Sequence, residues 1–478
     1  MWRLLSGIVL LAGASAHAET YYVDSGNGDD ARAGTSAAQA WRSLQPVNAV
    51  ELRPGDEVRF LAGGVWRGTL APRGRGEAAK PVIIGVSGTG PRPRIEGTDA
   101  DAVRLQNFPH VVLEGLEITN RGDGARPRRG VHIVAANTGT VAGVLVRDLY
   151  IHDVNGTNEE KDNGGIIFRT LGDEQPSRFD GLRIERNIIW RVDRSGIAAQ
   201  SYHWSRERWF PSRNVVLRDN YVADAGGDGI VPWATEGALV EHNIVRGANA
   251  RAGGYNAGIW PWSADRTLFR LNRASQVRTR LDGQGFDSDY NSQGTRFEYN
   301  LSHDNEGGFM LICSPGERDP RENVGNRGTV VRRNISRNDR ERIFHVSAAE
   351  NTLVEENYIY IGAGLDVQLL VLTDWRGWAD GLLIRNNRYV IKGRARLGHG
   401  VRRSEEGAYE LAEGWGGARN VKLEGNEELT QGVEVGDWTG PQFDPAHPED
   451  FPAFVAKHRQ WMEALMRAHF GEMDHPTH

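Results

Sequence analysis

The chain has 478 residues, of which 25% are charged and 39% are hydrophobic, and its formal net charge is −6. This acidic balance gives no reason to expect a nucleic acid or an anionic membrane surface as a partner. A single cysteine, Cys313, excludes an intramolecular disulfide, and its apolar neighbours Phe309 and Leu311 predict a buried, unreactive thiol.

Residues 1–18 have the composition of an export signal. Arg3 supplies a positive charge, an apolar stretch runs from Leu4 to Ala16, and small residues precede an expected cleavage site before Glu19. The apolar stretch is too short to span a bilayer. We therefore expect an exported protein, periplasmic or secreted, with no membrane insertion.

Residues 19–100 are expected to form an N-terminal cap and the first coils of a repeating structure. The end of a solenoid exposes unpaired backbone and apolar side chains, so it needs a cover. The segments 81–85 and 93–97 each run from a proline through a three-residue strand to a glycine, which predicts the first regular coils.

Residues 101–395 contain a short phrase that returns many times: hydrophobic, polar, Asn, hydrophobic. It occurs around Asn187, Asn220, Asn243, Asn272, Asn300, Asn334, Asn357 and Asn387. The gaps between these residues are 33, 23, 29, 28, 34, 23 and 30. A constant unit with elastic gaps predicts solenoid coils whose insertions lie in loops. We expect each Asn to adopt the left-handed conformation at a corner.

This repeat resembles the right-handed parallel β-helix of pectate-lyase-like and polygalacturonase-like enzymes. Two further blocks, 282–289 and 300–310, resemble segments of secreted β-helix proteins, some of them glycosidases. The predicted fold class is therefore an all-β solenoid, and the resemblance implies a carbohydrate-active enzyme.

Residues 396–478 lose the repeat and are expected to form a C-terminal capping segment. From Phe451 to His469 the apolar residues recur at helical spacing after a proline-rich lead-in. We expect this helix to pack on the solenoid, where a terminal coil has to be covered; the alternative is a partner-binding helix.

Glycines that open successive strands allow the coils to be aligned. The aligned strands begin at Gly165, Gly196, Gly229, Gly258, Gly285 and Gly308. Side chains alternate across a strand, so an inward apolar residue after each glycine leaves the next residue outward. The predicted outward set, contiguous on one face, is Arg169, Gln200, Trp233, Trp260, Trp262, Asp287 and Asp289.

Asp287 and Asp289 are the main catalytic candidates, because strands disfavour Asp and adjacent like charges repel. Glycoside hydrolysis needs two carboxyl groups, and their repulsion would hold one of them protonated. A calcium site or a turn is the structural alternative. The polygalacturonase-like resemblance favours an inverting reaction, although a retaining one stays open. Asp228 is a third acid candidate, and His303 could border the cleft or serve as a structural hydrogen bonder.

The tryptophans Trp233, Trp260 and Trp262, joined by Trp204, suit the apolar faces of sugar rings. Gln200 and Arg169 could then bind sugar hydroxyls. The alternative for the tryptophans is a place in the core, but an alternating Trp-Pro-Trp strand must expose at least one ring.

The sequence thus predicts a secreted glycoside hydrolase acting on a polysaccharide or oligosaccharide. It needs no cofactor, although calcium stays open as a ligand. A polysaccharide lyase or uronate epimerase is the first alternative, and it needs a cation and a base. Only five lysines occur, and the nearest to the aligned strands is Lys161, in a loop; Arg169, Arg194, Arg278 and Arg280 stay open as bases. A non-catalytic sugar-binding solenoid is the second alternative.

Overall fold

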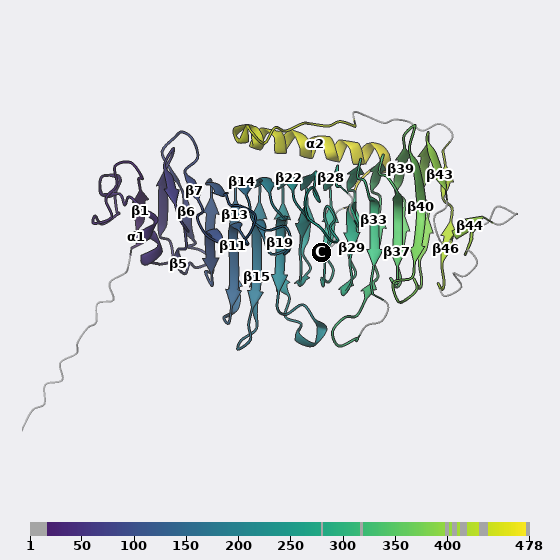
Figure 1. Cartoon of the computed structure of the whole chain (residues 1–478), viewed down its shortest axis with the longest axis horizontal. Helices are drawn as coiled ribbons and strands as arrows, with labels where there is room; N and C mark the ends of the chain where they lie inside the picture. The colour runs from purple at the N-terminus through teal and green to yellow at the C-terminus, as the bar shows by residue number, and fades with distance from the viewer. Residues whose placement is uncertain are drawn as a thin grey trace, which may run out of the picture.

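The computed structural model describes residues 17–278, 281–315, 319–396, 401–403, 409–411, 418–429 and 438–474. The predicted export signal therefore lies almost wholly outside the described residues. Figure 1 shows an elongated stack of parallel strands, with one long helix lying along its side. In this part of the chain no helix is long and apolar enough to cross a membrane.

The first long face of the stack is a parallel sheet of 14 strands among the described residues. In spatial order its strands are β1 (Thr20–Val23), β3 (Glu57–Leu61), β6 (Val82–Ser87), β9 (Val111–Glu114), β13 (Leu145–Arg147), β17 (Arg183–Glu185), β21 (Val216–Arg218), β25 (Leu239–Glu241), β27 (Leu268–Arg270), β31 (Arg296–Glu298), β35 (Val330–Arg332), β38 (Leu353–Glu355), β41 (Leu383–Arg385) and β46 (Lys422–Glu424).

The second long face is a parallel sheet of 13 strands in the same described part of the chain. Its strands are β4 (Val65–Arg67), β7 (Arg94–Glu96), β10 (Glu117–Asn120), β14 (Tyr150–Val154), β18 (Ile188–Val192), β22 (Tyr221–Ala225), β26 (Ile244–Arg246), β28 (Arg273–Ser275), β32 (Leu301–His303), β36 (Ile335–Arg337), β39 (Tyr358–Ile361), β42 (Arg388–Ile391) and β47 (Glu427–Glu428).

The third face is divided into two sheets of five strands each. The first contains β8 (Asp101–Gln106), β11 (Arg129–Ala136), β15 (Gly164–Leu171), β19 (Ser195–Ser201) and β23 (Ile230–Val231). The second contains β29 (Gln284–Ser288), β33 (Gly308–Cys313), β37 (Arg342–Ser347), β40 (Asp366–Thr373) and β43 (Arg394–Arg396). Single bridges from Ile259 to Ile230 and to Phe286 connect the two sheets, so the break falls at one coil.

Shorter elements complete the coils. The parallel pairs and small sheets are formed by β2 (Glu51–Leu52) with β5 (Arg73–Gly74), by β12 (Gly139–Ala142), β16 (Ser177–Asp180), β20 (Ser212–Arg213) and β24 (Thr235–Glu236), and by β30 (Ser292–Gln293) with β34 (Asn326–Arg327). An antiparallel pair joins β44 (Val401–Arg403) and β45 (Tyr409–Leu411). The short helices are η1 (Ala37–Gln39), α1 (Leu44–Ala49), η2 (Arg206–Arg208) and η3 (Pro448–Asp450).

The repeated asparagines form a buried ladder along the stack. In each coil the Asn Oδ1 accepts hydrogen bonds from the backbone N–H and the side-chain Nδ2 of the Asn one coil before, at 2.9–3.1 Å. The ladder continues to Asn426. The predicted equivalent corners are therefore confirmed.

The expected left-handed conformation of these asparagines is wrong by one residue. Positive φ belongs to the residue before each of them, for example Arg186 (53°), Asp219 (57°) and His242 (55°). The Asn contributes its side-chain amide. This amide forms hydrogen bonds with backbone groups that have no ladder partner at the corner.

One continuous apolar core fills the solenoid from Val23 to Tyr389. The expected N-terminal cap already belongs to this stack, because β1 pairs in parallel with β3 as the first strand of the long sheet. Side chains alternate along a strand, so the strands of all three faces contribute inward-pointing residues to this core.

The C-terminal helix is confirmed as α2 (Phe451–Phe470). It does not cover the last coil as expected but lies along the flank of the solenoid (Figure 1). Phe451 and Phe454 pack with Tyr150, Ile188 and Tyr221 of the second face. That face carries large apolar side chains outward over many coils, and a helix along the flank buries more of them than a cover at the end.

Candidate active site

A cavity of about 1020 Å³ opens where the third face is broken. The two coils at the break carry Pro232 and Pro261, and a proline has no N–H to donate to the ladder. Residues from several coils and loops line the cavity: Glu160, Lys161, Asp162, Arg169, Ser195, Ala198, Ala199, Gln200, Asp228, Val231, Trp233, Tyr255, Asn256, Ala257, Trp260, Trp262, Asp282, Asp287, Asp289, Tyr290, Leu311, Cys313, Ser314, Pro315, Trp375 and Arg376.

The alignment that predicted this face agrees with the structure for five coils. The apolar residues after the aligned glycines pair in register and point into the core: Ile166, Ile197, Ile230, Ile259 and Phe286. As a result Trp233, Trp260, Trp262, Asp287 and Asp289 all line the cavity, together with Arg169 and Gln200.

The sixth aligned coil is shifted by one residue. Gly308 pairs with Gln284, and Leu311 rather than Met310 lies beside Asp287. Gly308 has φ of 124° and thus occupies the left-handed opening position of the strand, as Gly164 does with φ of 132°. The shift places Leu311 and Cys313 on the cavity wall and Met310 in the core.

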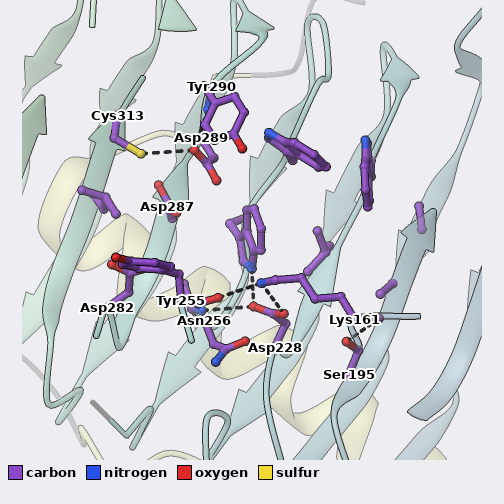
Figure 2. Close-up of a pocket in the computed structure, with 18 of the residues that line it drawn as sticks. Lys161, Ser195, Asp228, Tyr255, Asn256, Asp282, Asp287, Asp289, Tyr290 and Cys313 are labelled. Carbon is purple, nitrogen blue, oxygen red and sulfur yellow. Dashed lines mark hydrogen bonds and ion pairs between the residues drawn. The ribbon is translucent and has the colours of Figure 1, made fainter. Parts of the chain in front are cut away.

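Asp287 and Asp289 lie close together on this wall (Figure 2). One oxygen of each and the Cys313 Sγ are all within 4.8 Å of one another. Burial, and secondarily the neighbouring Asp289, raises the pKa of Asp287 well above its ordinary value of 3.8. Among the described residues its Oδ1 is buried without a hydrogen-bond partner. Burial therefore favours the neutral form of Asp287.

Asp289 is held in place by two donors. Its Oδ1 accepts a hydrogen bond from the Tyr290 backbone N–H at 2.7 Å and one from the Cys313 Sγ at 3.2 Å. Burial raises the pKa of Asp289 to about 7, although these two donors lower it. Hydrogen bonds to the charged form favour that form, so Asp289 is the member that ionises more readily.

Asp282 is a third carboxyl group on the cavity wall, which the sequence analysis did not include among the catalytic candidates. Burial raises its pKa to about 6, against lowering effects of Arg342 and Lys161. In Figure 2 Asp282, Asp287 and Asp289 lie on one side of the cavity, and Lys161 and Asp228 lie on the other. Asp228 directly precedes the aligned Gly229, whereas Asp282 lies three residues before the aligned Gly285, so the glycine alignment gave no signal for Asp282.

Asp228 is fully buried and anchored by four donors. Its Oδ1 accepts from the Ala257 N–H and from Trp260 Nε1, at 3.3 and 3.0 Å. Its Oδ2 accepts from Lys161 Nζ and from an Arg194 guanidinium nitrogen, at 2.9 and 3.2 Å. Both oxygens are thus occupied, and the geometry makes Asp228 a group that positions its neighbours.

Lys161, expected in a loop beside the strands, reaches into the cavity. Its Nζ lies 4.7 Å from the centre of the Trp260 ring and also donates to the Tyr255 carbonyl oxygen at 2.7 Å. Tyr255 is 65% exposed at the rim, and Trp375, also on the cavity, is 38% exposed. These two rim aromatics were not identified from the sequence, because neither lies on an aligned strand.

The tryptophans form one connected aromatic group. The Trp262 ring lies 4.0 Å from Trp233 and 5.4 Å from Trp204, the latter stacked, as measured between ring centres. Trp204 thus supports Trp262 from behind and does not itself line the cavity. The Trp233 Nε1 is buried without a hydrogen-bond partner among the described residues.

Two other candidates are placed differently. Arg169 lines the cavity but is paired with Asp162, 3.0 Å away. His303 lies on β32 of the second face, where it contacts Arg273 and Asp304, and it does not border the cavity. Its distance from the other candidates reflects the turn between the second and third faces, which places residues before the strand around a corner.

Asp287, Asp289 and Cys313 are the one group of potential metal ligands found in the described part of the chain. Calcium takes six to eight oxygen ligands, and a thiol is not among the groups it prefers. This donor set therefore does not fit the calcium ion that the sequence left open.

Comparison with known proteins agrees with this architecture. Residues 87–274 match the family described as the right handed beta helix region. The lacto-N-biosidase of Bifidobacterium longum subsp. longum is 29% identical, in an alignment that covers 73% of this chain and 28% of that protein. The chain thus spans a little more than a quarter of this curated relative.

Solved structures show the same likeness. The crystal structure of the GH136 lacto-N-biosidase from Eubacterium ramulus has a TM-score of 0.66 and 28% identity, covering 79% of this chain and 68% of that one. XylC in complex with xylose, at a TM-score of 0.51 and 14% identity, shares the fold. The chain is a right-handed parallel β-helix similar to carbohydrate-active enzymes, as the sequence predicted. Among these, the GH136 lacto-N-biosidases resemble it over most of its length.

Proposed function

We propose that the protein is a glycoside hydrolase that cleaves an oligosaccharide at the acidic wall of this cavity. The single observation that carries the proposal is Asp289, whose carboxylate is oriented by two donors beside a neutral Asp287, in a cavity walled by tryptophans. The likeness to lacto-N-biosidases supports a lacto-N-bioside as the substrate.

Asp289 is the nucleophile in this proposal. Its Oδ1 is engaged, and among the described residues its Oδ2 has no hydrogen-bond partner, which leaves that oxygen to attack the anomeric carbon. A covalent glycosyl intermediate and retention of configuration follow. This replaces the inverting reaction that the polygalacturonase-like resemblance favoured.

Asp282 is the proton donor. Asp287 lies two residues from Asp289 in the chain, with one oxygen of each within 4.8 Å of the other, so the two groups lie side by side. The acid of a retaining enzyme instead faces its nucleophile across the glycosidic bond, with roughly 5–5.5 Å between the two carboxyl groups. Asp282 is partly exposed, so it can regain a proton from solvent, and its pKa of about 6 suits proton transfer in weakly acidic solution. Asp287 stays protonated and limits the negative charge beside the nucleophile.

The sugar rings bind on the tryptophan wall. Trp233, Trp260 and Trp262 present flat apolar surface, and Gln200 and Lys161 offer polar contacts for hydroxyl groups. A cavity of about 1020 Å³ is at the upper end of the range for small-ligand sites, which suits more than one sugar ring.

The arrangement favours hydrolysis over elimination, although Lys161 does lie in the cavity. Its Nζ already donates to Asp228 and Tyr255, and Arg194 is likewise paired with Asp228. Arg278 is exposed and paired with Glu306, and Arg280 lies outside the described residues. The negative charge on Asp289 would repel the carboxylate that a lyase or epimerase substrate carries.

The test is hydrolysis of p-nitrophenyl lacto-N-bioside by the wild type and by the variants D282N, D287N and D289N. We expect D289N to lose roughly 10²–10⁴ in turnover. D282N should lose as much on a natural glycoside but less on the nitrophenyl substrate, whose leaving group needs little protonation. A wild type that releases no nitrophenol from this glycoside, but forms an unsaturated product that absorbs in the ultraviolet from a uronate-containing polysaccharide, would favour the lyase.

We also propose that the protein is exported and that no metal takes part. Residues 1–18 support the first point through their composition. Mature protein recovered outside the cytoplasm should begin at Glu19, and a mature chain that still carries Met1 would contradict export. Dialysis against a chelator should leave turnover unchanged, and restoration of a lost activity by calcium would contradict the second point.

A further inference from the structure

The environment of Cys313 points to a role beyond filling space. Cys313 ends β33, two residues after Leu311, which is the register partner of Asp287. The one-residue shift of this coil therefore turns the thiol toward the cavity, opposite Asp289. Its Sγ donates to Asp289 Oδ1 at 3.2 Å (Figure 2).

The thiol can act only as a neutral donor in this place. Burial and the adjacent Asp289 and Asp287 raise the pKa of Cys313 well above its ordinary value of 9.0. A thiol that keeps its proton is a weak hydrogen-bond donor and a poor nucleophile. Its side chain is 5% exposed, so the cavity offers it no partner in the described residues other than Asp289.

The two carboxyl groups of the pair differ mainly in their donors. Asp289 Oδ1 receives the Cys313 thiol and the Tyr290 N–H, whereas the Asp287 Oδ1 is buried without a partner. Two carboxyl groups with oxygens within 4.8 Å of each other repel when both are ionised, so a single negative charge is favoured. Hydrogen-bond donors stabilise that charge, so Asp289 is the group that ionises.

We propose that Cys313 is a positioning residue that keeps the negative charge on Asp289 and holds Asp289 Oδ2 toward the substrate. This inference rests on the proposed role of Asp289 as the nucleophile. No bond to sulfur forms or breaks: the thiol donates one hydrogen bond before, during and after the reaction. Serine at this position can keep the donor, and alanine cannot.

The first experiment compares the pH profile of kcat/KM for the wild type, C313A and C313S on p-nitrophenyl lacto-N-bioside. Asp289 faces Asp287 and Asp282, which oppose its ionisation, and Lys161, Tyr290 N–H and Cys313, which favour it. Loss of the thiol should move the acid limb of C313A upward by roughly half a pH unit. At a pH below the limb, kcat/KM should therefore fall about 3-fold. C313S should restore both.

The matched control is S288A, which removes a buried hydroxyl next to Asp289 in sequence. Ser288 Oγ bonds Thr329 Oγ1 at 2.9 Å on the core side, so the change perturbs packing without touching the carboxylate. We expect S288A to lower the Tm without moving the acid limb. An equal displacement of the limb in S288A and C313A, or an unmoved limb in C313A, would overturn the proposal.

A second measurement does not depend on activity. Because Cys313 is the single cysteine, its S–H stretching band in the infrared spectrum belongs to one residue. The band should shift to lower frequency as Asp289 ionises, and D289N should lose this pH dependence. A band that ignores pH in the wild type would overturn the positioning role. If the wild type hydrolyses no glycoside but the band follows pH, the proposed function fails while the Cys313–Asp289 hydrogen bond stands.

Discussion

At the scale of single residues, the acidic wall combines groups that favour activity at the expense of stability. Asp287 is buried beside another carboxyl group, and its Oδ1 has no hydrogen-bond partner. In the unfolded chain its pKa is near the ordinary 3.8, whereas folding raises it well above that value. The stability that this difference contributes is complete below the unfolded pKa and is lost as the pH rises through the folded pKa.

The variant D287N should therefore stabilise the fold in neutral and alkaline solution. Asn has no charge to desolvate, so the free energy of unfolding should rise by roughly 1–3 kcal/mol there. Below the unfolded pKa of 3.8 the gain should vanish. Chemical denaturation at both pH values measures this. A destabilised D287N in alkaline solution would mean that Asp287 is ionised and paired in the folded protein.

The pH dependence of catalysis follows from the other two acids. Asp289 must lose its proton and Asp282 must keep its own, so kcat/KM should describe a bell. The pKa of Asp289 is raised to about 7 and that of Asp282 to about 6, so the bell should be narrow, and D282N should abolish its alkaline limb on an activated substrate. A rate that keeps rising well above neutral pH would exclude Asp282 as the proton donor.

The sequence was sufficient to identify the strand that carries Asp287 and Asp289, because alternation and a glycine register are local properties. It could not identify Lys161, Tyr255 or Trp375, which reach the cavity from loops whose path depends on tertiary contacts. Glycine can occupy either of two positions at the start of a strand, that of Gly164 or that of Gly165, and the sequence does not distinguish them. The coil of Gly308 was therefore aligned one residue out of register, and Cys313 was interpreted as an unreactive core thiol. Whether a carboxyl group such as Asp282 closes a turn or faces a cavity depends on the coil above it.

At the scale of elements, two adjacent residues form each corner: the first adopts the left-handed backbone conformation, and the second is the ladder Asn, which provides the side-chain hydrogen bonds. Asn386, exposed, has φ of 53°, while the buried Asn387 donates to Asn426 Oδ1 from both its backbone N–H and its Nδ2, and to the Val354 carbonyl oxygen. The sequence predicted which residues recur but assigned the strained backbone to the wrong member of the pair.

A pair of neighbouring variants tests this division. N387V should lower the free energy of unfolding by roughly 1–3 kcal/mol, because it leaves buried groups unpaired. N386G should be neutral or slightly stabilising, because glycine adopts positive φ without strain. Thermal unfolding of both variants decides between them, and the reverse order of Tm would restore the original assignment.

The loop that carries Trp204 is fixed by Arg206. The Arg206 guanidinium binds both oxygens of Asp265, at 2.8 and 2.7 Å, and the backbone and side-chain oxygens of Asn291. Trp204 stacks on Trp262, so this anchor supports the tryptophan wall from behind.

Replacing this anchor should weaken substrate binding more than turnover. R206A frees Trp204 and Trp262 to move, so KM should rise about 3- to 30-fold while kcat changes little. R208A, a change to the neighbouring arginine on the same short helix, is the control. A drop in kcat with KM unchanged would show that the loop acts on the reacting groups and not on the sugar platform.

At the scale of the whole molecule, the solenoid makes the site by interrupting its own repeat. The long first and second faces run without a break through the stack, while the third face divides at the coil of Trp260 and Pro261. The regular faces keep the coils in register, and α2 braces the second face along the flank. The irregular coil is therefore not needed to keep the coils in register, and its cavity-facing positions hold tryptophans and acids.

The configuration of the released sugar tests the central claim most directly. The ¹H NMR spectrum of the product, recorded in the first moments of hydrolysis by the wild type, should show the same anomeric configuration as the substrate, because Asp289 attacks first and water attacks second. D289N, otherwise folded, should release no product under the same conditions. Release of the opposite anomer by the wild type would contradict a covalent Asp289 intermediate and return the reaction to a single displacement by water.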